Sequence, residues 1–370
     1  MTKNNHDRKL PTLQALRGVA ASLVVFHHFA SLFQGVGLRR SWIYESGLGN
    51  VGMSGVDIFF VISGFIMIYT SREKAGASDA VTFMKRRALR IYPLYWVWTS
   101  LLLILWLTGF AERLRHYSLS YLVKSFVLLP SFNGRSFHPM LEPGWTLAFE
   151  MLFYLVFSLA ICLKIVSKRL VFLVAAFSGI ALFSQVLPVA SGLRYLFTDP
   201  IIVEFVYGVL IAEVLLRLPG TRANRFAWTS PTAFISLGVV ALLSTIWMDK
   251  PDLYRFIFYG IPAIFIVLGA AMRGSAPAPR LLTYLGDCSF SIYLTHIFFA
   301  LAYASALKRL PALSSINPDL SIVVAATITI ALCSATYPLV ERRLMEAISS
   351  AKLPILAGEI QRPLPSSASR

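Results

Sequence analysis

Residues 16–29 read LRGVAASLVVFHHF, an apolar run with an arginine near its start and two histidines near its end. The run belongs to a longer apolar stretch, 13–33, which is long enough to cross the hydrocarbon core of a bilayer as a helix. Ionisable side chains are costly in that core, and where they occur they mark polar paths or substrate sites. The stretch therefore predicts a transmembrane helix with a functional face.

Similar apolar runs recur along the whole chain. Of its 370 residues, 56% are hydrophobic and 14% are charged, and the mean hydropathy is +0.67. We therefore predict an all-α polytopic membrane protein with about ten transmembrane helices. A shorter run, 119–129, contains Lys124 and is expected to lie at the membrane surface. The predicted spans are 13–33, 54–71, 89–109, 145–163, 169–187, 201–217, 229–247, 254–272, 286–307 and 320–341.

The net charge of +16 indicates orientation in the membrane rather than a nucleic-acid partner. Lys and Arg outside the spans are roughly twice as frequent on the side of the N-terminus, which places both termini in the cytoplasm. We divide the chain into a cytoplasmic N-terminal segment (1–12), one transmembrane domain (13–345) and a cytoplasmic tail (346–370). The tail is rich in Pro and Ser and is expected to be disordered.

The cysteines and histidines predict neither a disulfide nor a metal site. Cys162, Cys288 and Cys333 fall in apolar spans, and no pair has the spacing of a metal or redox site. The six histidines form no zinc pattern. Function is therefore sought among polar side chains within the spans.

Arg17 and His28 share one face of the first predicted helix. The second follows the first by eleven positions, which is three full turns plus about 20°, and about 16 Å along the axis. His27 points about 80° away from that face. A snorkelling arginine and a packed histidine are the structural alternative. We favour a polar channel lined by Arg17 and His28, and a packing role for His27.

Two carboxylates are expected near the depth of His28. Asp57 lies just inside the outer end of span 54–71, and Glu150 lies a few residues inside the outer end of span 145–163. A carboxylate beside a histidine fixes its tautomer and stabilises the imidazolium when the histidine acts as a general base. Structural ion pairs are the alternative for both carboxylates. We predict a catalytic site formed by His28, Asp57 and Glu150.

Other polar side chains lie where they can line the same channel. Ser63 can contribute a hydroxyl, although close helix packing at Ser63 and Gly64 is the favoured role. Trp145 is expected to be an interfacial anchor, and a structural or a functional histidine fits His296 equally well. We assign these residues to a possible substrate channel: Ser63, Trp145, Ser291, Tyr293 and His296. At the cytoplasmic boundary, Glu341 is expected to pair with the adjacent Arg342 or Arg343.

A cytoplasmic basic cluster, KRRALR at 85–90, opens the span 89–109. Arg87 and Arg90 are three residues apart and share a face at the predicted start of a helix. Arginine forks and a helix N-terminus both suit phosphate oxygens. Anchoring on anionic lipid fits the spacing equally well.

Five strings, in this order along the chain, resemble the bacterial acyltransferase-3 family of integral membrane proteins: LRGVAASLVVFHHF, GVDIFFVISGFIM, RRALRIYPLYW, PGWTLAFEMLFY and SFSIYLTH. The resemblance covers about 13–345. The family signature of Arg, ten residues and His falls on Arg17 and His28, and its Arg-x-x-Arg element falls on Arg87 and Arg90. The chain is most similar to the short, stand-alone members that modify exopolysaccharides.

The resemblance implies transfer of an acyl group, expected to be acetyl, from cytoplasmic acyl-coenzyme A to a sugar hydroxyl of an extracytoplasmic or lipid-linked polysaccharide. It implies a multi-pass protein of the bacterial inner membrane, with no permanently bound cofactor and with other polysaccharide biosynthesis proteins as partners. Arg87 and Arg90 would hold the coenzyme A phosphates, and Arg17 would line the route of the pantetheine arm. His28 would deprotonate the acceptor or carry the acyl group, and both routes stay open.

A transporter or flippase for a small anion or lipid-linked sugar is the alternative function, because intramembrane charges also mark transport paths. Inverted repeats with broken helices would favour it. The sequence contains no repeat of fixed period, so acyl transfer is preferred.

The helical-face argument makes a prediction about neighbouring histidines. His28→Ala should abolish acyl transfer while the protein remains inserted and folded, because it removes the proposed base. His27→Ala should retain substantial activity. Acyl transfer measured in membranes that contain equal amounts of each variant tests this, and an indispensable His27 would refute the argument.

Overall fold

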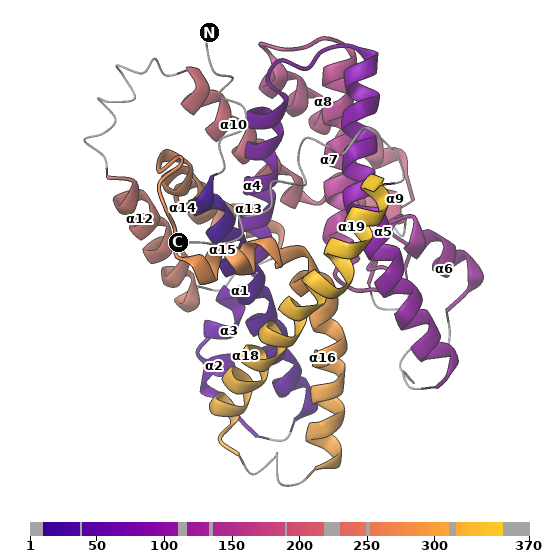
Figure 1. Ribbon diagram of the computed structural model, residues 1–370, viewed down its shortest axis with the longest axis vertical. Coiled ribbons are helices and arrows are strands. Elements are labelled where there is room, and N and C mark those ends of the chain that lie inside the picture. The colour runs from indigo at the N-terminus through magenta and orange to yellow at the C-terminus, as the bar shows by residue number, and fades with distance from the viewer. Residues whose placement is uncertain are drawn as a thin grey trace, which may run out of the picture.

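The computed structural model describes residues 10–37, 39–109, 117–132, 136–188, 191–217, 230–248, 252–310 and 316–350, and every regular element within them is a helix (Figure 1). The longer helices are α1 (Pro11–Val36), α4 (Ser54–Ser71), α5 (Ala77–Leu107), α7 (Gly144–Cys162), α8 (Arg169–Phe183), α10 (Val203–Arg217), α12 (Pro231–Ser244), α14 (Gly260–Met272), α16 (Ser289–Arg309) and α18 (Pro318–Thr336). The shorter helices are α2 (Trp42–Glu45), α3 (Leu48–Val51), α6 (Leu119–Phe126), α9 (Gly192–Thr198), α13 (Arg255–Phe258), α15 (Arg280–Asp287) and α19 (Arg342–Ser350). Short 3₁₀ turns extend or join several of these helices, at Ser184–Val186, Pro200–Ile202, Thr245–Trp247 and Asp252–Tyr254. A π-helical turn, η8 (Tyr337–Glu341), connects α18 to α19.

Eight helical segments of the described chain are long and apolar enough to cross a membrane. The all-helical membrane fold expected from the sequence is therefore confirmed. The predicted spans 201–217 and 229–247 correspond to α10 and α12, which are shorter, at 15 and 14 residues. The number of spans and the cytoplasmic side of the termini stay predictions.

The outer limits of the chain are only partly described. Residues 1–9 of the N-terminal segment and residues 351–370 of the tail lie outside the described residues. Helix α19 continues to Ser350, so the first residues of the predicted tail, 346–350, are helical.

Helix α5 begins at Ala77 rather than at 89, the predicted start of its span. Arg87 and Arg90 therefore lie in the interior of a helix, and the helix N-terminus that was expected beside them is several turns away. Pro93 also lies inside α5 without ending it.

The predicted surface segment 119–129 forms the short helix α6, which α5 holds through side-chain hydrogen bonds. Tyr95 Oη donates to the carbonyl oxygen of Ser125 at 2.7 Å, and Trp96 Nε1 donates to that of Phe126 at 2.8 Å. These donors satisfy carbonyl groups at the C-terminal end of α6, which have no partner within the helix.

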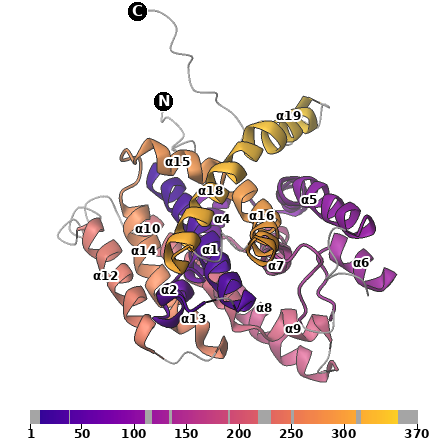
Figure 2. The same cartoon turned by 90° about the horizontal axis from the view of Figure 1, so that it is seen from below.

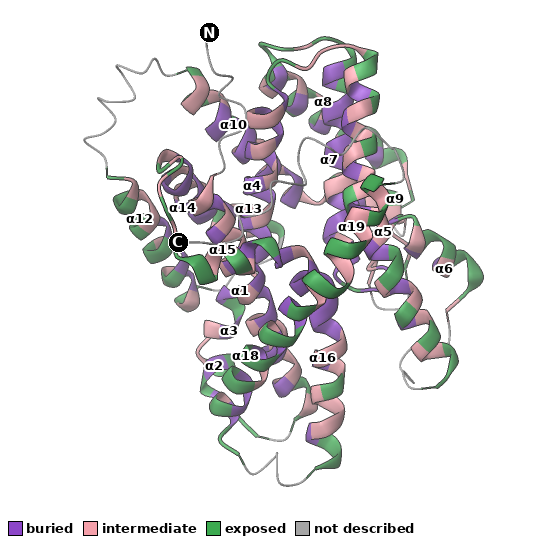
Figure 3. Cartoon of the chain, viewed as in Figure 1, coloured by how far each residue is buried: buried purple, intermediate pink, exposed green. Residues whose placement is uncertain are grey.

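Helix α1 occupies the middle of the bundle and packs against α4, α15, α16 and α18 (Figures 1 and 2). Its buried positions are mostly small or branched apolar residues, and the burial follows the inward faces of the surrounding helices (Figure 3). Large apolar side chains remain exposed on the outward faces, as expected for surfaces that contact lipid. Examples are Leu155, Leu159, Val171, Leu182, Val240, Val324 and Leu332.

Helices α4 and α10 cross at backbone contact distance. A Cβ atom on Gly64 would lie 2.0 Å from the carbonyl oxygen of Phe205, and one on Gly208 would lie 2.0 Å from that of Val61. Small residues allow such an approach, so the packing role expected for Gly64 is present. Beside the crossing, the ring of Phe205 stacks on that of Phe60 with centroids 4.3 Å apart.

A buried arginine joins α8 to the end of α4. Arg169 donates from Nη1 to the carbonyl oxygen of Ser71 at 2.6 Å and from Nη2 to that of Lys74 at 2.5 Å. Its Nε donates to the carbonyl oxygen of Ile165 at 2.8 Å. Because these acceptors are backbone groups, the guanidinium fixes the turn that leads from α4 toward α5.

Candidate active site

Glu150 of α7 forms the centre of an inner polar cluster. Its Oε1 accepts hydrogen bonds from Ser63 Oγ of α4, at 3.3 Å, and from Tyr154 Oη one turn further along α7. The charge of Glu150 also acts on Arg17 of α1. The structure thus brings together three residues that the sequence singled out, Arg17, Ser63 and Glu150.

Glu341 extends this inner cluster from the π-helical turn η8. Its Oε2 accepts a hydrogen bond of 2.5 Å from Ser291 Oγ of α16, and its charge interacts with Arg17 and Arg90. The expected pairing with Arg342 is wrong, because Arg342 donates instead to Glu346 at 2.8 Å. A π turn shifts the following side chains around the helix axis, and no pattern in the sequence predicts it.

The two arginines of the basic cluster have different surroundings. The guanidinium carbon of Arg87 lies 5.5 Å from the ring centroids of both Phe83 and Tyr154, and the residue is buried. Arg90 is exposed, and its charge reaches Arg17. The basic cluster is therefore continuous with the inner polar cluster around Glu150.

His28 lies at the other end of the polar face of α1. Its Nδ1 is 2.8 Å from the carbonyl oxygen of Val24. A carbonyl oxygen only accepts, so Nδ1 carries the proton and the neutral ring keeps its lone pair on Nε2. The ring lies 4.8 Å from that of His296 and 5.4 Å from that of His27, centroid to centroid. His28 can therefore accept a proton at Nε2.

A cavity of about 300 Å³ adjoins His28. Helix α1 contributes one wall and α16 the other, and Glu142 contributes a carboxylate from the turn before α7. Apart from His28, Ser31 and Glu142, its lining is apolar or glycine. The lining residues are His28, Ser31, Leu32, Gly35, Val36, Glu142, Ile297, Ala300, Leu301 and Ala304.

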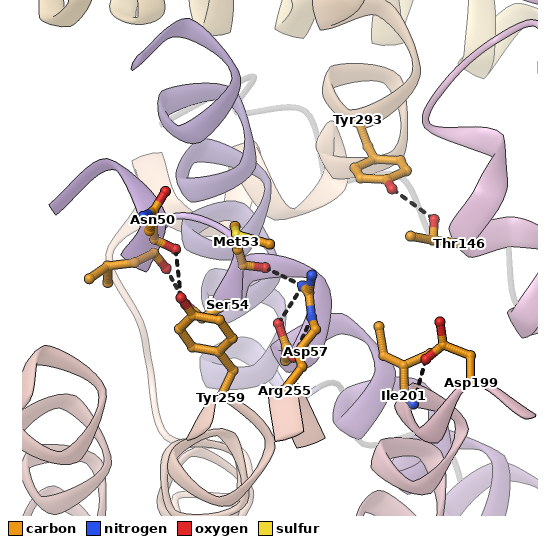
Figure 4. A network of polar contacts seen from close by, with 11 residues as sticks. Asn50, Met53, Ser54, Asp57, Thr146, Asp199, Ile201, Arg255, Tyr259 and Tyr293 are labelled. Carbon is orange, nitrogen blue, oxygen red and sulfur yellow. Dashed lines mark hydrogen bonds and ion pairs between the residues drawn. The ribbon is translucent and has the colours of Figure 1, made fainter. Parts of the chain in front are cut away.

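His296 and Tyr293 place further polar groups on α16 between the inner cluster and this cavity. His296 is fully buried, with Nδ1 3.2 Å from the carbonyl oxygen of Ile292. Its Nε2 has no hydrogen-bond partner within the described part of the chain. Tyr293 Oη forms a 2.7 Å hydrogen bond with Thr146 Oγ1 of α7 (Figure 4). Tyr293 interacts electrostatically with both Glu150 and Glu142, so it links the two ends.

Asp57 has a different partner from the one expected. Arg255 of α13 donates to its Oδ1 from Nε at 3.0 Å and to its Oδ2 from Nη2 at 2.8 Å (Figure 4). Nη2 also donates to the carbonyl oxygen of Met53 at 2.9 Å. The fully buried Glu204 lies beside this pair and interacts with both of its members. The contacts of Asp57 are therefore those of a structural ion pair, which was the alternative to a catalytic role.

The expectation that Asp57 and Glu150 lie at one depth is also corrected. Glu150 contacts Ser63, which follows Asp57 on α4 by six positions, or about 9 Å along the axis. We expected α7 to run in the same direction as α4, but the sequence does not predict how far α7 is displaced along α4. Glu150 consequently lies nearer the level of Arg17.

Three charged residues were overlooked in the sequence. Glu204 and Arg255 lie in predicted spans, so the rule that singled out Arg17 would have found them. Glu142 lies just before the span 145–163, in the string LEPGW, where a surface carboxylate attracts no attention.

Trp145, the expected interfacial anchor, lies on the first turn of α7. Its ring stacks on that of His138, with centroids 5.5 Å apart and planes 13° apart. His138 Nδ1 lies 3.8 Å from Glu142 Oε1. The neighbouring His138 is the main cause of a lowered pKa for Glu142, against the opposing effect of partial desolvation. Glu142 is thus held as a carboxylate beside Trp145.

The chain is similar in sequence to several known proteins. A family model described as an acyltransferase domain matches residues 10–337. Exopolysaccharide production protein ExoZ of Rhizobium meliloti (strain 1021) is 33% identical over 261 residues, which cover 69% of this chain and 79% of ExoZ. Acyltransferase MdmB of Streptomyces mycarofaciens is 26% identical over 328 residues, 81% of each chain. The putative peptidoglycan O-acetyltransferase YrhL of Bacillus subtilis (strain 168) is 26% identical over 374 residues, 92% of this chain and 55% of YrhL. No solved structure matches the chain.

The Asp57–Arg255 pair leads to a prediction that separates structural from catalytic roles. Asp57→Asn should lower the free energy of unfolding by about 3–5 kcal/mol, because removing one partner leaves a buried charge poorly compensated. The double variant with Arg255→Gln should be less destabilised than the sum of the single variants. Unfolding followed by circular dichroism in detergent measures this.

Glu346→Gln, which breaks an exposed pair with Arg342, is the control and should change stability little. If the Asp57→Asn protein were fully stable but inactive, Asp57 would instead have a catalytic role.

Proposed function

The chain belongs to the acyltransferase-3 family of membrane O-acyltransferases, and we propose that it transfers an acetyl group from cytoplasmic acetyl-coenzyme A to a sugar hydroxyl of a polysaccharide beyond the outer face of the bacterial inner membrane. The polysaccharide acceptor is suggested by the names of ExoZ, an exopolysaccharide production protein, and YrhL, a putative peptidoglycan O-acetyltransferase. The family assignment makes the chain an O-acyltransferase. The donor, the acceptor and the membrane are part of the proposal.

One observation carries this proposal: the polar residues of the bundle form two ends joined through its interior. Arg87 and Arg90 lie at one end with Arg17, and His28 lies at the other beside a cavity. Donor and acceptor can therefore be bound from opposite sides of the membrane. Tyr293 lies between the ends, within electrostatic reach of a carboxylate in each.

At the inner end, arginines suit the donor. Arg87 and Arg90 are cations that can bind the phosphates of coenzyme A, and an arginine fork matches phosphate oxygens. Arg17 continues the cationic face into the membrane, where it can line the route of the pantetheine arm. Glu150 and Glu341 keep Arg17 compensated in that apolar setting.

At the outer end, His28 supplies the proton chemistry. Its Nε2 lone pair takes the proton of the acceptor hydroxyl as the hydroxyl oxygen attacks the thioester carbonyl carbon. The carbon–sulfur bond then breaks, and the imidazolium returns the proton to the leaving thiolate. Transfer through an acyl group carried on Nε2 uses the same lone pair. Asp57 is not required for either route.

The direct test of the proposed function is the O-acetyl content of surface polysaccharide. Cells that lack the protein should lose the O-acetyl groups that the wild-type protein restores, and His28→Ala should fail to restore them. Mass spectrometry of the isolated polysaccharide measures the modification. An unchanged acetyl content in cells without the protein would refute the proposed acceptor class.

The inner arginines should serve the donor alone. Replacing Arg87 or Arg90 with Ala should raise the donor KM about 10- to 100-fold, since a charge-assisted phosphate contact is worth about 1.5–3 kcal/mol. Lysine should rescue only partly, because it lacks the planar fork. Donor titration of purified, detergent-solubilised variants measures this.

Arg342→Ala, which removes an exposed arginine paired with Glu346, is the matched control and should leave the donor KM unchanged. Unchanged donor affinity in the double Arg87, Arg90 variant would refute the proposed donor site.

A further inference from the structure

His28 needs a partner for the positive charge that it acquires when it takes a proton, and neither carboxylate expected from the sequence is in contact with it. Both oxygens of Asp57 accept hydrogen bonds from Arg255. Glu150 accepts hydrogen bonds from Ser63 and Tyr154 in the inner cluster. An imidazolium in a partly apolar cavity is costly without a nearby negative charge.

Glu142 is the carboxylate that shares a cavity with His28. Its backbone lies in a turn fixed by two hydrogen bonds, from Gly144 N to the carbonyl oxygen of Leu141 at 2.8 Å and from Trp145 N to that of Glu142 at 3.1 Å. The turn leads directly into α7, so this helix determines where the backbone of Glu142 lies. Half of its side chain is exposed, which leaves it accessible from the cavity.

The titratable side chains that act on Glu142 are histidines. The charges of His28 and His296 act on it, and His138 approaches its Oε1 to 3.8 Å. Within the described part of the chain, His28 interacts electrostatically with His27 on the same helix, with His296 on α16 and with Glu142 on the turn before α7. Glu142 is the anion among these three side chains.

We infer that Glu142 is a positioning residue for acyl transfer, which stabilises the imidazolium of His28 while that ring holds the proton of the acceptor hydroxyl. The inference rests on the proposed function. The proton leaves the hydroxyl oxygen, resides on His28 Nε2 while the new carbon–oxygen bond forms, and passes to the sulfur of the departing thiolate. Glu142 remains a carboxylate throughout and neither gains nor loses an atom.

This role should appear in both the rate and its pH dependence. Glu142→Gln keeps the shape of the side chain and removes its charge, so kcat should fall by at least about tenfold with the donor KM unchanged. The acid limb of the kcat/KM profile should move to lower pH by about one half to one unit, because the imidazolium loses its counter-charge. Glu142→Asp should recover part of kcat and most of the limb position.

The matched control is Glu45→Gln. Glu45 is also a half-exposed carboxylate beside a cation, with Oε1 3.5 Å from Arg40 Nε, and it does not line the cavity of His28. This variant should have the wild-type rate and pH profile. Kinetics are measured with acetyl-coenzyme A and a soluble oligosaccharide acceptor, on protein checked for folding by size-exclusion chromatography.

A second measurement does not depend on turnover. In protein with ¹³C-labelled histidine, the His28 ring resonance is identified by its absence in His28→Gln, and its titration is followed by NMR in detergent. Glu142→Gln should shift its midpoint to lower pH, and Glu45→Gln should not. An unshifted midpoint would overturn the inference even where acetyl transfer occurs. A shifted midpoint in a protein that transfers no acetyl group would uphold the pairing and refute the proposed function.

One kinetic outcome also opposes the inference. If Glu142→Gln raises only the acceptor KM, with kcat and the acid limb unchanged, then Glu142 binds the acceptor and does not act through His28.

Discussion

The cost of an uncompensated charge in an apolar bundle is the constraint on which this structure depends. Within a membrane, water is not available to solvate an ionised side chain, so each one needs partners supplied by neighbouring helices. Glu150 has Ser63 and Tyr154, Asp57 has Arg255, and Glu341 has Ser291. The contact between Tyr154 and Glu150 lies within α7. Each of the other contacts joins two helical elements that are far apart in the sequence. The charged residues thus specify which helices are neighbours.

The same constraint divides the polar residues into a structural and a functional set. Arg255 gives Asp57 two hydrogen bonds and a full counter-charge, which is the pattern of a pair that holds α13 against α4. Arg17 has electrostatic partners, but among the described residues no hydrogen bond fixes its guanidinium to a single carboxylate. A cation compensated in this looser way can exchange partners when an anionic substrate arrives. We therefore expect function near Arg17 and rigidity near Asp57.

Much of this organisation can be predicted from the sequence. The features that could not be predicted have identifiable physical reasons. Hydropathy identified the long helices because a bilayer imposes their length, and the helical period placed Arg17 and His28 on one face. The pairing of Asp57 with Arg255 could not be predicted, because it depends on which helix packs against α4. Hydropathy does not determine that neighbour. The turn that carries Glu142 lies outside the spans, where neither length nor periodicity constrains the chain. The partner of Glu341 was missed because a π-helical turn breaks the regular period.

The crossing of α4 and α10 has a mechanical consequence. At Gly64 and Gly208 backbone meets backbone, with no side chain that could change rotamer and take up a displacement. The close backbone contact therefore opposes sliding of these two helices, and the Asp57–Arg255 pair attaches α13 to α4. Helix α5 meets α16 differently, through side chains such as Trp98 and Phe298, whose rings lie 5.8 Å apart. A displacement between α5 and α16 can therefore be taken up by changes in side-chain rotamers, whereas α4 and α10 form a fixed frame.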